Sequence, residues 1–176
     1  GAGAVEVDDA VVDRVAAGRL DGQEEARQRI EEAEKRAQRP QGSVRLLAVS
    51  KTFPADAIRD LHGSGQRAFG ENYVQEASAK REALADLGDI EWYLIGPLQS
   101  NKTRIAAACF DWVESVDRPQ IADRLAAARE SGKPLDVLVQ VTASGEATNH
   151  GRRRNTRQRP TGAGPNQALA RALARA

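Results

Sequence analysis

The residue of this chain whose type and position could do covalent chemistry is Lys51, which directly follows the apolar segment VRLLAVS. A lysine at the mouth of a buried sheet can lose solvation, which favours its neutral amine and allows a Schiff base with a carbonyl. The alternative is a surface lysine whose ammonium reaches water from a strand end. Of the other four lysines, Lys35 and Lys80 lie in charged helical segments, Lys133 lies in a predicted turn, and Lys102 is expected on a solvated helix.

Asn72 is the second candidate, because its amide could fix a ligand. Its alternative role is to cap a helix beginning at Tyr73, since Asn is a preferred N-cap. Glu71 could orient a base or remain a solvated charge, and Gly96 allows either a close backbone approach to a ligand or a tight turn before Pro97. Further polar residues follow other apolar segments: Ser50 and Thr52, Ser115 and Asp117, Thr142 and Ser144.

Several classes of site are excluded by composition. Cys109 is the only cysteine, so a disulfide scaffold and a cysteine-rich zinc site are excluded, and Cys109 itself is expected in the core. His62 and His150 have no carboxylate or thiol at metal-ligand spacing, so we expect no metal. No apolar stretch approaches the roughly 18 residues of a membrane span. The segment GAGAVEVDDA has no features of a secretory signal, so we predict a cytoplasmic protein without a membrane partner.

The elements that must position these residues alternate regularly along the chain. After a predicted helical region reaching residue 40, in which Val11, Val12 and Val15 share a face, five apolar segments have the length of strands. They span residues 44–50, 66–72, 90–96, 111–117 and 135–145, and helical segments lie between them. This order predicts an α/β fold with a parallel sheet, either open and doubly wound or a (β/α) barrel. In both architectures the sites lie at the carboxyl ends of the strands.

A sharp change of composition follows Gly151. Residues 152–176 contain seven arginines and no acidic residue, which leaves 19 basic and 25 acidic residues in 1–151. The sequence therefore predicts a domain over 1–151 and an Arg/Ala-rich, disordered tail over 152–176. Seven arginines could contact nucleic-acid phosphates. The tail has no aromatic residue for stacking on bases and the preceding domain is acidic, so we expect no nucleic-acid partner.

Taken together, five segments resemble a known family, the pyridoxal phosphate homeostasis proteins (YggS/PROSC type), which are related to the N-terminal barrel of alanine racemase. The resemblance covers roughly residues 25–151. The matching segments, in the family's order and spacing, are LLAVSKT (46–52), FGENYVQE (69–76), EWYLIGPLQSNK (91–102), FDWVESVDR (110–118) and VLVQVTASGEA (137–147).

The resemblance implies a (β/α)8 TIM barrel of the alanine racemase N-terminal type, of which this chain holds about the first five strands. It implies that Lys51 carries pyridoxal 5′-phosphate as an internal aldimine and that Asn72 lies near the cofactor ring. Members of the family are thought to buffer this cofactor or deliver it to dependent apoenzymes, which influences amino-acid and keto-acid balance, and they are not regarded as enzymes. The alternatives are a racemase, which needs a second base, and a non-functional fragment.

Two departures from the family pattern stand out. Tyr93 occupies the position of the family's histidine in Trp-His-Phe-Ile-Gly. The family also continues with strands whose Ser-rich and Arg-Ile-Gly-Thr segments bind the phosphate, whereas here the resemblance ends near Gly151. One hypothesis is a truncated or frameshifted product whose tail is translated out of frame. An incomplete barrel would expose a sheet edge, so we expect dimerisation or poor solubility. Without the phosphate-binding segments we expect weak or absent cofactor binding.

Overall fold

The computed structural model describes residues 13–16, 20–129, 134–141 and 154–155 of the chain. The chain divides into two compact units. The first consists of residues up to Gly70 together with Asp86–Ile90, and the second consists of Glu71–Ala85 together with the residues from Glu91 onward. The division falls within a strand, so that Gly70 belongs to the first unit and Glu71 to the second.

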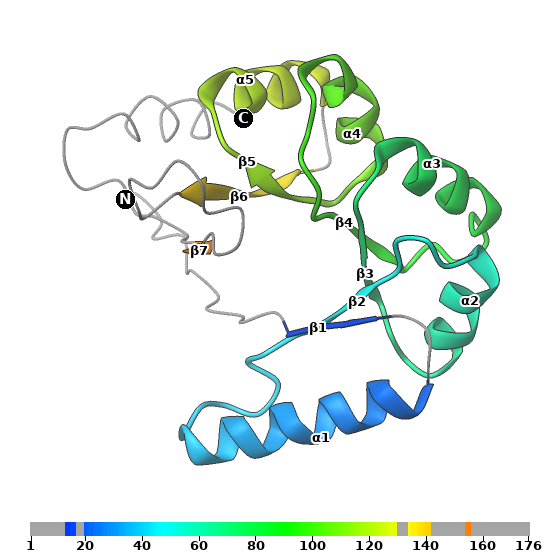
Figure 1. Ribbon diagram of the computed structural model, residues 1–176, viewed down its shortest axis with the longest axis vertical. Helices are drawn as coiled ribbons and strands as arrows, with labels where there is room; N and C mark the ends of the chain where they lie inside the picture. The colour runs from blue at the N-terminus through cyan, green and yellow to red at the C-terminus, as the bar shows by residue number, and fades with distance from the viewer. Residues whose placement is uncertain (1–12, 17–19, 130–133, 142–153, 156–176) are drawn as a thin grey trace. The chain divides into compact units, whose positions relative to one another are not determined.

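The first unit holds three parallel strands and two helices (Figure 1). In chain order these are β1 (Asp13–Ala16), α1 (Leu20–Arg36), β2 (Leu46–Val49), α2 (Ala55–Gly63) and the start of β3 (Ala68–Glu71). Strand β1 pairs with β2 in a register that runs from Asp13↔Leu46 to Ala16↔Val49. Strand β2 pairs with β3 at Ala48↔Phe69 and Val49↔Gly70. Ile58 and Leu61 of α2 are three residues apart, which places them on one face of the helix, and both are buried in the core.

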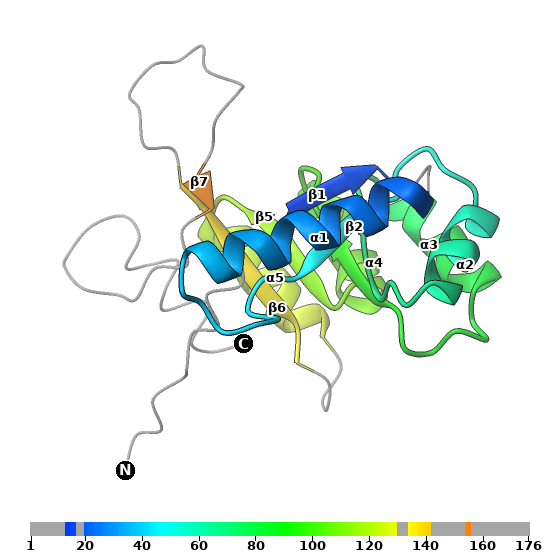
Figure 2. The same ribbon diagram turned by 90° about the horizontal axis from the view of Figure 1, so that it is seen from below.

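The structure corrects the sequence prediction at residues 13–16. This segment was expected to be helical, but it forms β1 beside β2, and α1 lies alongside it (Figures 1 and 2). Local helix preference is weak evidence where a segment can pair with a neighbouring strand. The other two valines of the predicted helical face, Val11 and Val12, lie outside the described residues.

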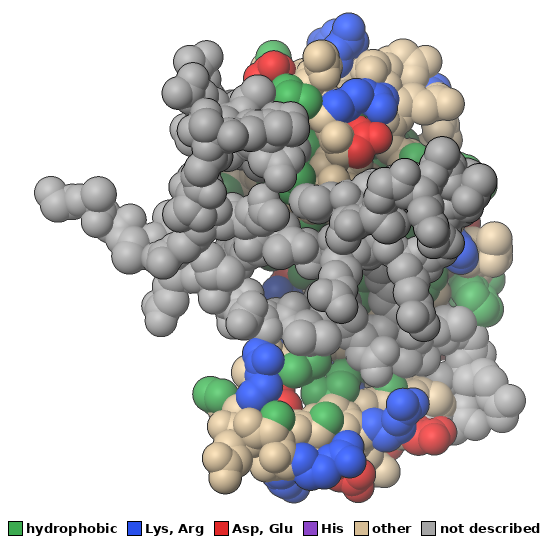
Figure 3. Space-filling model, turned by 60° about the vertical axis from the view of Figure 1, so that its left-hand side comes forward, with side chains coloured by type: hydrophobic (Ala, Val, Ile, Leu, Met, Phe, Trp, Pro, Cys, Tyr) green, Lys and Arg blue, Asp and Glu red, His purple; other side chains and the backbone are tan. Residues whose placement is uncertain are grey.

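Helix α1 presents a charged face, as its sequence predicts. Over α1, in the lower part of Figure 3, Lys and Arg side chains alternate with Asp and Glu. Beyond the helix, Gln38 adopts a positive φ of 54° and the chain turns. Glu34 then fixes the following loop by accepting from the backbone N–H groups of Gly42 and Val44 at 2.9 and 2.8 Å. These hydrogen bonds lower the pKa of the Glu34 carboxyl, and the bond from Gly42 has the largest effect.

The second unit repeats the strand–helix pattern. It holds α3 (Val74–Ala83), β4 (Glu91–Leu94), the 3-10 turn η1 (Ser100–Lys102), α4 (Thr103–Cys109), β5 (Trp112–Val116), α5 (Pro119–Ala128), β6 (Asp136–Val141) and β7 (Arg154–Asn155). β4 and β5 are parallel, as are β5 and β6, whereas β7 runs antiparallel to β6. Helices α4 and α5 contact each other (Figures 1 and 2).

The predicted α/β class and the five predicted strands are confirmed as β2 to β6. Lys102 was expected on the helix between the predicted strands 90–96 and 111–117, but the Ser-Asn-Lys segment forms a 3-10 turn and α4 begins only at Thr103. Ser and Asn are poor residues for the interior of a helix. Cys109 is buried, as predicted. No helix among the described residues is long and apolar enough to cross a membrane.

The tail predicted to be disordered contributes one described element. Arg154 and Asn155 form β7, paired with Val141 and Gln140 of β6, which the sequence prediction did not include. The rest of residues 152–176 lies outside the described residues, and so do the strand-end candidates Thr142 and Ser144.

Candidate functional site

Lys51 lies in a tight turn at the carboxyl end of β2, in the first unit. The turn is closed by the Phe53 N–H, which donates to the Ser50 carbonyl at 3.1 Å. Ser50 is fully buried, and its N–H donates to the Gly70 carbonyl of β3 at 2.9 Å, so the backbone that leads into Lys51 is fixed to the sheet. The Lys51 side chain itself is exposed, and it has no hydrogen-bond or ion-pair partner among the described residues.

The residue after Lys51 holds a rare conformation. Thr52 has a φ of 68°, in the left-handed region that β-branched residues seldom adopt. A positive φ at this third position is what a type II turn requires, and glycine usually supplies it. Such strain persists where the surrounding structure enforces it, and it is most common at functional sites. The turn therefore presents Lys51 on a backbone that is costly to deform.

Asn72 follows β3 in the second unit and is half-buried. The alternative that Asn72 caps the next helix is wrong. Helix α3 begins at Val74, its N-cap residue is Tyr73, and no side chain caps it by a hydrogen bond. The backbone of Asn72 instead lies directly against Gly96 beyond the end of β4. A Cβ on Gly96 would lie 2.8 Å from the Asn72 Cα and closer still to its carbonyl oxygen.

Glu71 is buried, so the alternative that it remains a solvated charge is wrong. Its side chain is fully buried, and its Oε1 accepts from the Lys80 Nζ at 2.8 Å. Lys80 also donates to the Glu76 Oε1 at 2.7 Å, one turn earlier on α3. Lys80 lies in a helix, as the sequence predicts, but the charged segment did not indicate that its side chain is only 8% exposed. The Glu76–Lys80 spacing of four residues was visible in the sequence. The pairing of Lys80 with Glu71, which lies on β3, was not.

Gly96 is the close-approach glycine that the sequence suggested, although its neighbour is protein backbone. The Ile95 N–H donates to the Glu71 carbonyl at 2.9 Å, which brings the end of β4 against the end of β3. Because Gly96 has no side chain, Asn72 can pass beside it. Tyr93, in the same strand, stacks on Trp112 with ring centroids 5.4 Å apart and donates its hydroxyl to Glu91 at 3.2 Å. The aromatic ring in the family's histidine position is thus part of a cross-strand pair.

His62 has structural partners rather than metal-ligating ones. His62 Nε2 lies 2.6 Å from the Asp89 carboxylate, and Arg67 contacts the same carboxylate at 2.6 Å. No cluster of three or more His, Cys, Asp or Glu suited to a metal occurs among the described residues. His150 lies outside that part of the chain.

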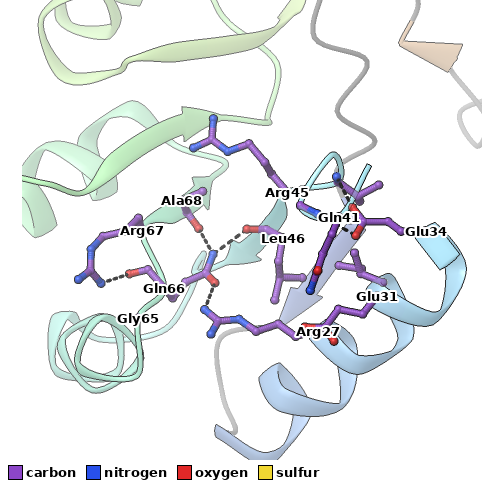
Figure 4. A pocket seen from close by; sticks show the side chains of 13 residues that line it. Arg27, Glu31, Glu34, Gln41, Arg45, Leu46, Gly65, Gln66, Arg67 and Ala68 are labelled. Atoms are coloured by element: carbon purple, nitrogen blue, oxygen red, sulfur yellow. Dashed lines mark hydrogen bonds between the residues drawn. The ribbon is translucent and has the colours of Figure 1, made fainter. Parts of the chain in front are cut away.

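The first unit contains a pocket of about 340 Å³ between α1 and the starts of β2 and β3 (Figure 4). Its polar groups bind one another. The buried Gln66 amide donates to the Leu46 and Ala68 carbonyls at 2.7 and 2.8 Å, and its oxygen accepts from Gln23 at 3.0 Å. The pocket lies at the amino ends of these strands, whereas Lys51 follows the carboxyl end of β2, so the pocket is not the Lys51 site.

Comparison with known proteins defines the class of this domain. The family model of the alanine racemase N-terminal domain matches residues 23–153, which include all five predicted strands. The structure of PipY from Synechococcus elongatus solved without pyridoxal phosphate is similar, with a TM-score of 0.58 and 47% sequence identity. That similarity covers 68% of this chain and 55% of PipY. The fold is therefore the TIM-barrel-like α/β fold of the alanine racemase N-terminal domain.

Several curated relatives of this chain share one description. The pyridoxal phosphate homeostasis protein of Pseudomonas aeruginosa is 55% identical over 124 residues, which are 70% of this chain and 54% of that protein. A second PipY structure, solved with pyridoxal phosphate bound, is 52% identical over 56% of this chain and 46% of PipY, at a TM-score of 0.49. The chain belongs to the pyridoxal phosphate homeostasis protein family. It spans about half the length of the curated relatives it matches.

Proposed function

We propose that the chain binds pyridoxal 5′-phosphate covalently through the amine of Lys51 and holds it for cofactor homeostasis rather than for turnover. The observation that carries this proposal is the Lys51 turn. The turn places an exposed amine, with no partner among the described residues, on a backbone fixed by Ser50 and strained at Thr52. Membership of the pyridoxal phosphate homeostasis protein family supports pyridoxal phosphate as the ligand.

The residues present suit this cofactor, which when bound supplies an aldehyde carbon as an electrophile. The Lys51 amine, after its ammonium proton passes to water, attacks that carbon. A carbon–nitrogen double bond would form and the aldehyde oxygen would leave as water. This condensation changes no oxidation state, so it needs no oxidant or further reactant. Because Lys51 is exposed, water can reach the bond and reverse the step, as release to another protein requires.

Asn72 is the proposed second contact. Its side-chain amide offers both donors and an acceptor for polar substituents of the cofactor ring. Pyridoxal phosphate-dependent apoenzymes are the proposed recipients, with a consequent influence on amino-acid and keto-acid balance. We place this function in the reducing cytoplasm, in keeping with the single, buried thiol of Cys109.

The test is chemical trapping on the full chain. One equivalent of pyridoxal phosphate is added, the mixture is reduced with borohydride, and the modified peptides are mapped by mass. We expect the adduct on Lys51 and its loss in Lys51→Ala. Lys102→Ala is the matched control. Lys102 is half-buried in η1 and is not the proposed site, so this variant should keep the adduct on Lys51. Equal adducts on Lys35, Lys51 and Lys102 would contradict the proposal, since exposure alone would then explain the modification.

A further inference from the structure

We propose that Gly96 and Glu71 are positioning residues that hold Asn72 in the orientation in which its amide meets the cofactor. This inference rests on the proposed function and extends it to two residues that need not touch the ligand. All three residues belong to the second unit. The structure carries the inference through the contacts on either side of Asn72.

The contact on the β4 side is steric. A Cβ added to Gly96 would lie 2.8 Å from the Asn72 Cα and 3.0 Å from its carbonyl carbon. Real Cβ atoms do not approach backbone atoms this closely, so any side chain at position 96 must displace Asn72 or the end of β4. Gly96 does not adopt a positive φ, so the requirement for glycine comes from space rather than from conformation.

The contact on the β3 side is electrostatic, and it decides which partner moves. Glu71 directly precedes Asn72, and its buried carboxylate accepts from the buried Lys80 at 2.8 Å. Its carbonyl accepts from the Ile95 N–H at 2.9 Å. Breaking a buried ion pair leaves an uncompensated charge, so Glu71 resists displacement. A methyl group at position 96 is therefore expected to rotate Asn72 about its fixed neighbour rather than to shift the whole strand.

The test is a double-mutant cycle on the full chain, with the dissociation constant for pyridoxal phosphate measured by absorbance titration. Asn72→Ala and Gly96→Ala are each expected to raise the dissociation constant by about three- to tenfold, the effect of one lost polar contact. In the Asn72→Ala background Gly96→Ala should cause no further loss, because the amide that it misplaces is absent.

The matched control is Gly88→Ala. Gly88 also lacks a positive φ, and nothing lies within 4 Å of its added Cβ. The same chemical change there should leave the dissociation constant unaltered. An unchanged affinity in Gly96→Ala would overturn the inference. So would a Gly96→Ala loss that adds in full to that of Asn72→Ala, because it would show that Gly96 acts by another route.

If Gly96→Ala does not fold, the cycle is run with Glu71→Gln, which loosens the other contact without adding bulk. A loss that vanishes in the Asn72→Ala background supports the inference, and one that persists there contradicts it. A measurement without cofactor separates this inference from the proposed function. The Asn72 side-chain amide resonances should shift in Gly96→Ala and stay in place in Gly88→Ala. Static resonances would overturn the positioning role even if the Lys51 adduct forms.

Discussion

The ends of β2 and β3 are built in opposite ways. Beyond β2, Lys51 is exposed, has no partner among the described residues, and precedes a strained Thr52. Beyond β3, Glu71 is fully buried and paired with the buried Lys80, and Asn72 lies against Gly96. One strand end presents an exposed amine, while the other fixes a polar group by burial and charge. Lys80 is thus part of the buried structure, whereas Lys51, the lysine of the proposed function, is not.

The largest expected difference is between these two lysines. Lys80→Met removes the ammonium that pairs with the buried Glu71 carboxylate, which should lower the free energy of unfolding by about 3–5 kcal/mol. Lys51→Met removes an exposed side chain and should change it by no more than about 0.5 kcal/mol. Urea denaturation followed by circular dichroism measures both.

The combined variant Glu71→Gln with Lys80→Met separates charge from packing. It removes both members of the buried pair, so most of the stability lost in Lys80→Met should return. If the double variant is as unstable as Lys80→Met, then lost packing of the lysine stem, not an unpaired charge, explains the effect. Equal effects of Lys80→Met and Lys51→Met would remove the contrast between the two strand ends.

The same two strand ends show which features of the fold can be predicted from the sequence and which cannot. The five strands and Lys51 follow from local signals, because an apolar run next to a lone lysine is visible in the sequence. The burial of Lys80 could not be predicted, because its partner Glu71 lies on another element and only the packing of α3 against β3 brings them together. Strand β1 was missed for a similar reason, since its pairing with β2 joins segments more than thirty residues apart.

Thr52 offers a smaller effect of the opposite sign. A left-handed conformation costs an L-residue about 1–2 kcal/mol, and glycine adopts it freely. Thr52→Gly should therefore raise the free energy of unfolding, by up to about 1 kcal/mol after the greater chain entropy of glycine is subtracted. Thermal unfolding at neutral pH measures the change. A lower melting temperature would show that contacts of the threonine side chain outweigh the strain.

A third strand end combines burial with a missing partner. Ser115 near the end of β5 is buried, and its hydroxyl has no hydrogen-bond partner among the described residues. Ser115→Ala should be neutral or stabilising by up to about 1 kcal/mol, because no hydrogen bond is lost. Thr103→Val is the matched comparison and should be destabilising, since the buried Thr103 hydroxyl donates to the Ser100 carbonyl at 2.9 Å. Equal effects in the two variants would show that the Ser115 hydroxyl is satisfied.

The smallest expected effect concerns the exposed ion pairs of the first unit, which contrast with the buried pair of Glu71. The hydrogen bond from His62 lowers the pKa of Asp89 below its ordinary 3.8, and the hydrogen bond from Arg59 lowers the pKa of Asp86 in the same direction. A carboxylate with a lowered folded-state pKa stabilises the fold at pH values above its unfolded pKa. That contribution is lost as the pH falls below 3.8 and through the lower folded-state pKa.

Urea midpoints measured from pH 7 to pH 2.5 should therefore fall less steeply in Asp89→Asn than in the parent chain, and only in the acidic part of that range. Added salt should reduce this difference, because exposed charges are screened within about 10 Å at 0.1 M ionic strength. The loss caused by Lys80→Met should persist in salt, since the Glu71–Lys80 pair is buried. Equal salt sensitivity of the two pairs would contradict the distinction between an exposed and a buried ion pair, because screening acts mainly on charges in contact with solvent.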